Sequence, residues 1–315
     1  MMAGAAVADP APRLRPLQAD GAPPFAARGR DAYARWRDAK LRNYPRTLED
    51  IVVEVDDPRR LTGAEHAAIR ACLARANMAV YASRVREPDR AIARLLAAQF
   101  GLGAADANWL ADEDAISSIE VREHGPKRDH IPYTNLPLSW HTDGYYHPPG
   151  RAIRAMILHC VRQAASGGEN LLLDHELAYL ALRDLDPAHV RCLMRPDAMT
   201  IPARWESGAI ARAAQSGPVF SIGARDGRLH MRYTARTRSI AWRDDAQTRE
   251  AVALLSRLLA GELEQTAARI LRVRLEPGMG LICANVLHAR SRFSDDPDHP
   301  RLLYRARYHD ALAFD

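Results

Sequence analysis

Residues 140–144 (WHTDG) place a histidine and an aspartate two positions apart, at His141 and Asp143. On an extended strand, residues i and i+2 face the same side, so both side chains can reach one metal ion from a single short segment. The ion then needs a third protein ligand, and the candidate is His288, far downstream in residues 285–290 (NVLHAR). A His-x-Asp triplet alone also occurs in surface turns, so the interpretation depends on the residues that accompany it.

Two imidazoles and one carboxylate on one face of a metal, with the remaining positions open, form the ligand set of non-haem Fe(II) oxygenases. The two tyrosines that follow the triplet, Tyr145 and Tyr146, either line a substrate pocket or pack over its mouth. The nearby His147 and His159 are interpreted as ordinary polar or core histidines, because most histidines outside a ligand set are. The sequence therefore predicts one metal site with three protein ligands.

Composition narrows the possible partners of the chain. Its 315 residues are long enough to bury a full core, and 26% charged residues are ordinary for a globular protein. The net charge of +5 comes from dispersed arginines without a run of like charges, which argues against a nucleic-acid partner. No apolar run is long enough to span a bilayer, and residues 1–27 contain no secretory segment. Four widely spaced cysteines favour a reducing compartment, so we expect a cytoplasmic protein: Cys72, Cys160, Cys192 and Cys283.

Hydrophobic patterning predicts many short strands and few long helices. Residues 1–30 are rich in Ala, Pro and Arg without periodicity and are predicted to be a disordered tail, while 31–315 are predicted to form a single domain. Because the candidate ligands come from distant segments, we expect a mainly β fold with flanking helices, a double-stranded β-helix or jelly roll. Helices are predicted at 31–41, 62–76, 89–100, 174–185, 187–193 and 246–264, and strands at 51–55, 78–81, 117–123, 152–161, 170–173, 219–222, 228–233, 270–275, 280–284 and 301–308.

The last predicted strand is unusually basic. Period-2 alternation places Arg301, Leu303, Arg305 and Arg307 on one face. Arginine is suited to binding a carboxylate through two parallel hydrogen bonds. The alternative is a solvated edge strand, in which basic residues prevent aggregation. Arg232 and the following Arg236 and Arg238 are interpreted as surface residues, with the alternative that one of them reaches the site.

The chain from about residue 51 to its end resembles the taurine dioxygenase (TauD/TfdA) family of Fe(II)- and 2-oxoglutarate-dependent oxygenases. The resemblance rests on His141-x-Asp143, the turn at Gly167 and Gly168, then His288, and Arg301 thirteen positions later. It implies that His141, Asp143 and His288 bind iron and that Arg301 binds the distal carboxylate of 2-oxoglutarate.

Two further roles are implied by the resemblance. Arg305, four positions after Arg301, stands where the taurine enzyme contacts its acidic substrate, and Tyr145 is the candidate to line the same pocket. Asn170 stands where the family commonly has a threonine whose hydroxyl helps to bind the cosubstrate. An asparagine amide can still donate a hydrogen bond there.

The implied activity is hydroxylation of a small, anionic organic molecule by dioxygen, with release of succinate and CO2 from 2-oxoglutarate. Asp143 argues against a halogenase, because related halogenases free that ligand position for halide. The sequence leaves two alternatives: a Zn(II)-dependent hydrolase that uses the same triad, and a catalytically silent ligand-binding protein on the same scaffold. Self-association into a homo-oligomer is common in the family.

Overall fold

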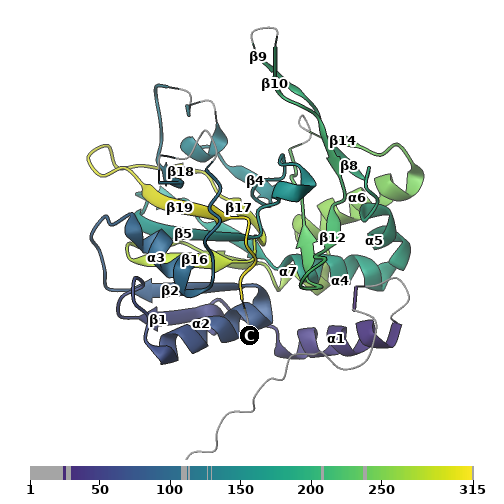
Figure 1. Cartoon of the computed structure of the whole chain (residues 1–315), viewed down its shortest axis with the longest axis horizontal. Helices are drawn as coiled ribbons and strands as arrows, with labels where there is room; N and C mark the ends of the chain where they lie inside the picture. Colours follow the sequence, from purple (N-terminus) through teal and green to yellow (C-terminus); the bar gives the residue numbers. More distant parts are fainter. Residues whose placement is uncertain are drawn as a thin grey trace, which may run out of the picture.

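Two sheets of antiparallel strands form the centre of the computed structural model, which describes residues 24–25, 30–107, 112, 114–125, 127–128, 130–206, 209–236 and 240–313. The larger sheet has the spatial order β1 (Val52–Val55), β2 (Met78–Ser83), β16 (Met279–Cys283), β5 (Ala155–Arg162), β19 (Leu302–Tyr308) and β3 (Ile116–Ile119). The smaller has the order β15 (Leu271–Val273), β7 (Asn170–Leu173), β17 (Leu287–Arg290) and β4 (Leu138–His141). Together with the flanking helices they form the predicted double-stranded β-helix (Figure 1).

Helices cover the larger sheet at one end. Within it only β1 and β2 are parallel, because α2 (Gly63–Ala76) connects them. The predicted capping box starts α2. The Thr62 hydroxyl accepts a hydrogen bond from the backbone N–H of Glu65, and the side-chain carboxylate of Glu65 accepts one from the backbone N–H of Thr62. The helix ends at Asn77, which adopts a left-handed conformation with φ of 58°. The next helix, α3 (Ala91–Gln99), packs against β5 and β19.

The remaining helices form a second layer beside the smaller sheet (Figure 1). Aspartate side chains cap α4 (His175–Leu185), α5 (Pro187–Leu193) and α6 (Ala246–Leu259), each by accepting a backbone N–H of the first turn. The predicted helix over 246–264 is too long: it ends at Leu259 before Gly261, whose φ is 77°, and the chain resumes helix in α7 (Glu264–Ala267). The first helix, α1 (Arg30–Asn43), lies below this layer, and single 3-10 turns occur at Glu49–Ile51, Ile131–Tyr133 and Pro149–Arg151.

Several short strands lie outside the two sheets. The predicted hairpin is present as β12 (Phe220–Ile222) and β13 (Leu229–Met231), and β18 (Phe293–Ser294) pairs with β6 (Ser166–Gly167). Sequence patterning missed β8 (Met199–Ile201), β11 (Gln215–Gly217) and β14 (Ala241–Trp242), which form a three-stranded sheet. It also missed the hairpin of β9 (Arg204–Glu206) and β10 (Ala209–Arg212), which projects from the body (Figure 1). Strands of two to four residues give too little alternation to be recognised in the sequence.

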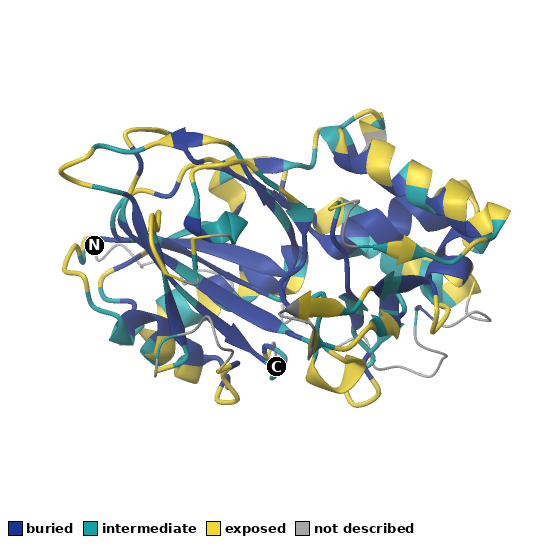
Figure 2. Cartoon of the chain, turned by 90° about the horizontal axis from the view of Figure 1, so that it is seen from above, coloured by how far each residue is buried: buried dark blue, intermediate teal, exposed yellow. Residues whose placement is uncertain are grey.

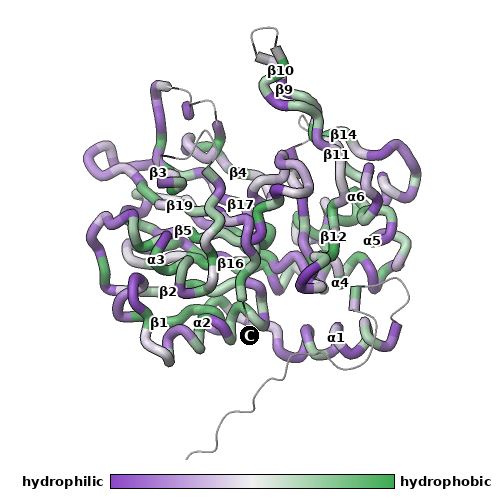
Figure 3. The backbone as a smooth tube through the Cα atoms, viewed as in Figure 1, coloured by the Kyte–Doolittle hydropathy of each residue, from purple (hydrophilic) through white to green (hydrophobic). Residues whose placement is uncertain are grey.

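The core lies between the sheets and beneath the helices. Figure 2 shows the central strands as buried and the outward faces of the helices as exposed, and Figure 3 shows the same strands as hydrophobic. Every residue of β19 except Arg305 is buried, because β5 and β3 pair with it on both sides. The edge-strand alternative for this basic strand is therefore wrong.

Four other predictions concern the chain as a whole. The four cysteines are free and buried, as expected. No helix within the described ranges has the length and apolar character that crossing a bilayer requires. Most of the predicted tail over 1–30 lies outside the described residues, although Phe25 is buried against Trp36 and Tyr179. A single domain over 31–315 stays a prediction.

Candidate metal and cosubstrate site

The three predicted metal ligands lie together. His141 at the end of β4 and His288 in β17 are direct partners across the smaller sheet, so their rings face the same side with centroids 4.2 Å apart. Oδ1 of Asp143 lies 3.6 Å from Nε2 of His141 and 4.0 Å from Nε2 of His288. Ligand atoms of one first-row metal, each bonded at about 2.0–2.2 Å, are at most about 4.4 Å apart. The spacing therefore fits a single ion.

Both histidines present the nitrogen that a metal needs. Nδ1 of His141 donates to the carbonyl of Ser139, and Nδ1 of His288 donates to the carbonyl of Val286, each at 2.9 Å. A proton on Nδ1 leaves the lone pair of Nε2 free to bind a metal. Burial, followed by the neighbouring His141, lowers the pKa of His288 to about 4, so its ring is neutral at physiological pH.

Asp143 is a buried carboxylate held in its charged form. Burial by itself raises its pKa, but the positive charge of Arg305 and the neighbouring His141 bring that pKa well below its usual range. Within the described residues its Oδ2 has no hydrogen-bond partner, and Nη1 of Arg305 lies 3.4 Å away. A buried carboxylate oxygen without a hydrogen bond, beside two imidazole nitrogens with free lone pairs, fits a divalent cation.

Asn285 joins the two segments that carry the ligands, and sequence reasoning did not identify this role. Its Oδ1 accepts from the backbone N–H of Asp143 at 2.8 Å, and its Nδ2 donates to the carbonyls of Asp143 and Ile153 at 3.0 and 2.7 Å. The residue is buried and has a positive φ of 52°, which asparagine tolerates better than most residues. An asparagine three positions before a metal-binding histidine was the available signal.

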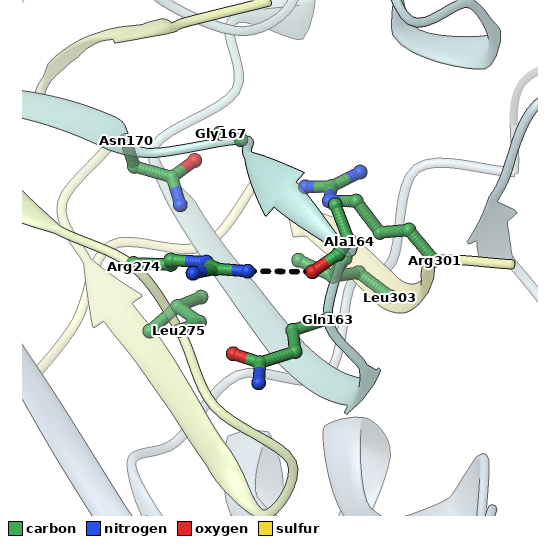
Figure 4. A pocket seen from close by; sticks show the side chains of 9 residues that line it. Gln163, Ala164, Gly167, Asn170, Arg274, Leu275, Arg301 and Leu303 are labelled. Carbon is green, nitrogen blue, oxygen red and sulfur yellow. Dashed lines mark hydrogen bonds between the residues drawn. The ribbon is translucent and has the colours of Figure 1, made fainter. Parts of the chain in front are cut away.

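Arg301, Asn170 and Leu303 line one small cavity (Figure 4), of about 210 Å³ with its open mouth. Arg301 is buried, and its Nη1 has no hydrogen-bond partner in the described part of the chain. Burial lowers the pKa of Arg301 to about 10, which still leaves it charged at neutral pH. The amide of Asn170 makes only a long bond of 3.5 Å, to the carbonyl of Val273. A guanidinium and an amide that share a cavity with capacity to spare fit a carboxylate.

A second arginine at this cavity was missed. Arg274 lines it beside Arg301, and its Nη2 donates to the carbonyls of Ala164 and Ala165 at 2.6 and 3.1 Å (Figure 4). Unlike Arg301 it is largely exposed, so it lies at the mouth of the cavity.

The Gly-Gly turn has a steric cause in this structure. Gly167 has a φ of 70°, and a Cβ there would lie 2.2 Å from the carbonyl oxygen of Arg292. Gly168 has a φ of 73°, and a Cβ there would meet Phe293 at 3.5 Å and Nε of Arg301 at 3.7 Å. Only glycine allows the turn to pass this close to β18 and to Arg301.

Tyr145 lines a larger cleft, of about 530 Å³ with its open mouth, which also borders Asp143. Part of its basic and polar lining comes from β5, β12 and β13 and the segments beside them: Arg154, Ser221, His230 and Arg232. Arg232 was predicted to be a surface residue, and that is wrong. It is buried, and it donates to the carbonyls of Tyr145, Met199 and Gln215 at 2.7–3.1 Å. Arg236 makes no such side-chain hydrogen bonds to the described residues, and Arg238 lies outside them.

Arg307 forms a buried pair instead of a solvated end. Its Nη2 donates to Oδ2 of Asp106 at 2.6 Å, and its Nη1 donates to the hydroxyl of Tyr146 at 3.2 Å. Tyr146 therefore packs against the end of β19, whereas Tyr145 faces the cleft. His147 and His159 stay outside the metal site, since His147 lies 3.5 Å from Asp106 and His159 bonds the hydroxyl of Tyr81.

Comparison with known sequences gives one family and two informative relatives. Residues 40–307 match the profile of the family described as "Taurine catabolism dioxygenase TauD, TfdA family". A uridine-5′-phosphate dioxygenase from an Amycolatopsis species is 34% identical over 178 residues, which cover 55% of this chain and 61% of that protein, less than two thirds of its length. One from a Streptomyces species is 31% identical over 215 residues, covering 67% of this chain and 76% of that protein.

Solved structures share the fold at low sequence identity. The non-haem iron oxygenase OrfP with Fe and α-ketoglutaric acid is 20% identical, with a TM-score of 0.57 over 89% of this chain and 91% of that one. Asparagine oxygenase is 16% identical, with a TM-score of 0.54 over 83% and 93%. A taurine dioxygenase from Burkholderia xenovorans is 22% identical, with a TM-score of 0.53 over 84% and 89%.

Proposed function

Because the chain belongs to the TauD/TfdA family of Fe(II)- and 2-oxoglutarate-dependent dioxygenases, we propose that it hydroxylates a small anionic organic molecule, with release of succinate and CO2. Its cofactors are Fe(II), for which His141, Asp143 and His288 are the ligand set, and 2-oxoglutarate. Bound together, they use dioxygen to oxidise a C–H bond while 2-oxoglutarate loses CO2. Membership of this family excludes the two alternatives that the sequence left open, a zinc-dependent hydrolase and a catalytically silent binding protein.

In this proposal Arg301 binds the distal carboxylate of 2-oxoglutarate. Its buried Nη1 lacks an acceptor within the described residues, and the amide of Asn170 lies at the same cavity to donate a second hydrogen bond. Both groups hold the cosubstrate at one end and so orient its other end towards the three metal ligands. The protein contributes binding and orientation, while the oxidising chemistry belongs to the cofactors.

The observation that carries the anionic substrate is the position of Arg305. Its guanidinium lies 3.4 Å from the carboxylate of Asp143, and its Nε is buried without a hydrogen-bond partner in the described part of the chain. A buried donor left without an acceptor is costly, so a ligand that supplies one is favoured. We assign Arg305 to the anionic group of the primary substrate, with Tyr145 in the wall of the adjoining cleft.

The names of the two relatives suggest phosphate as the anionic group, since both act on uridine-5′-phosphate. The test is succinate formation from 2-oxoglutarate by the Fe(II)-loaded protein under air, with uridine-5′-phosphate, other phosphate esters, sulfonates and carboxylates. Each anion is paired with its neutral counterpart, such as uridine. We expect an anion to stimulate turnover at least tenfold more than its counterpart.

Arg305→Gln is the matched variant. It should abolish the preference for the anion and leave the slow, substrate-free consumption of 2-oxoglutarate in place. Equal stimulation of the wild-type protein by charged and neutral compounds would refute the anionic substrate, and so would a full preference retained by Arg305→Gln.

A further inference from the structure

Phe293 packs behind the lining of the cosubstrate cavity, against the Gly-Gly turn and Arg301. It is 3% exposed, and its strand β18 pairs with the Gly-Gly turn, with Phe293 opposite Gly167. Its backbone N–H donates to the carbonyl of Asn135 at 3.3 Å, which attaches it to the segment before β4. A ring this deeply buried in a strand of only two residues is held by its contacts with neighbouring segments more than by the pairing of the strand.

Two guanidinium groups lie against this ring. The Cζ of Arg290 is 4.8 Å from the ring centroid of Phe293, and the Cζ of Arg301 is 5.1 Å from it. Both distances are within the range of cation–π attraction, which is strongest where water is excluded. Arg290 and Arg301 are each 5% exposed, so both charges are desolvated.

The two arginines are like charges that need compensation. Burial, and then the charge of Arg301, lower the pKa of Arg290 to about 9. Arg290 donates to the carbonyls of Thr134 and Leu136 at 2.7 and 2.6 Å, and more weakly to those of Ile131 and Pro132. Its place is thus fixed by carbonyl oxygens, whereas Nη1 of Arg301 has no hydrogen-bond partner among the described residues.

We propose that Phe293 is a positioning residue for 2-oxoglutarate: its ring holds the guanidinium of Arg301 towards the cavity and relieves its repulsion from Arg290. The inference rests on the proposed role of Arg301. Phe293 touches neither substrate nor metal in this account. It acts only through Arg301, so its loss should weaken cosubstrate binding and leave metal binding alone.

The test compares Phe293→Met, which keeps most of the volume but removes the ring, with Phe220→Met. Phe220 is equally buried but packs against Tyr179 in the helical layer, so it controls for the general loss of a core ring. Calorimetric titration of the anaerobic Fe(II)-loaded protein gives the Kd for 2-oxoglutarate, and a competing chelator gives the Kd for Fe(II). We expect Phe293→Met to weaken the binding of 2-oxoglutarate about thirtyfold, the effect of one desolvated cation–π contact. The Fe(II) affinity of Phe293→Met should not change, and Phe220→Met should change neither Kd. Phe293→Leu serves if the methionine variant does not fold.

A double-mutant cycle with Arg301→Ala separates this inference from the one beneath it. If Phe293 acts through Arg301, adding Phe293→Met to Arg301→Ala has no further effect on the Kd for 2-oxoglutarate. An Arg301→Ala protein with wild-type affinity would refute the proposed role of Arg301. If Arg301→Ala weakens binding while Phe293→Met changes it less than twofold, or weakens it equally in both backgrounds, the positioning role is refuted. Equal losses in 2-oxoglutarate and Fe(II) affinity would also refute it.

Discussion

Replacing Arg301 by alanine removes the only buried guanidinium at the cosubstrate cavity among the described residues. Truncating one partner of a buried, hydrogen-bonded charge pair costs roughly 2–5 kcal/mol, or about thirtyfold to several thousandfold in affinity. Two features of the structure decide where in this range the effect falls. The cavity is small and Arg301 is 5% exposed, which favours a large effect. Arg274 remains at the mouth, but it is exposed and already bonded to two carbonyls, so it compensates only in part.

We therefore expect the KM for 2-oxoglutarate to rise about a hundredfold in Arg301→Ala, whatever primary substrate is used. Arg301→Lys should lie between the two proteins, because a lysine keeps the charge but not the paired donors. The assay is the initial rate of succinate formation at increasing 2-oxoglutarate, with Arg305→Gln as the control whose 2-oxoglutarate requirement should not change. A KM within threefold of wild type in Arg301→Ala would refute the assignment, and a rise as large in Arg305→Gln would refute the division of roles between the two arginines.

Three other predictions follow from the geometry. Asn285→Ala removes all three hydrogen bonds that the side chain makes to backbone groups near the metal ligands. It should weaken Fe(II) binding about 10–100-fold in a chelator competition. Unchanged binding would show that these segments hold their places without Asn285. Gly167→Ala should destabilise the protein by at least about 2 kcal/mol in urea unfolding, because of its positive φ and the contact of the added Cβ with Arg292. Gly63→Ala, with open space around its Cβ, should have little effect, and similar urea midpoints for the two variants would contradict the prediction. Burial lowers the pKa of His159 to about 4, below its unfolded value of about 6.5. The unfolded chain therefore binds the extra proton, and the free energy of unfolding falls by up to about 3 kcal/mol as the pH is lowered from about 6.5 to about 4. His159→Gln should flatten this part of the pH profile, and an unchanged slope would exclude His159 as its cause.

The sequence predicts the parts of the site that have a local pattern. Residues 141 and 143 are two apart in the sequence, and the structure places both beside His288, although β4 ends at His141 and Asp143 lies in the turn that follows. The glycine pair and the role proposed for Arg301 came from the resemblance to the family, through their residue types and their order along the chain. Only the His-x-Asp triplet and the alternation of the last strand can be recognised from a few neighbouring residues.

What the sequence does not predict depends on partners far along the chain. The acid that pairs with Arg307 is Asp106, 201 positions away, and nothing near Arg307 indicates it. Arg232 is buried because three carbonyls accept its hydrogen bonds, and backbone carbonyls leave no trace in a sequence. Period-2 alternation gave the correct face for Arg305 and Arg307, but burial of that face required knowing that β3 pairs along the outer side of β19.

The direct pairing of His141 with His288 also makes the metal site sensitive to strand register. Side chains alternate between the two faces of a sheet, so a slip of β17 by one residue against β4 would turn His288 away from His141 and bring Leu287 or Ala289 to its place. The two strands are far apart in the chain, so their pairing closes a long loop and carries the entropic cost of a non-local contact. Iron is therefore bound only by molecules in which this pairing has formed correctly, so metal occupancy measures the fraction of chains with native register.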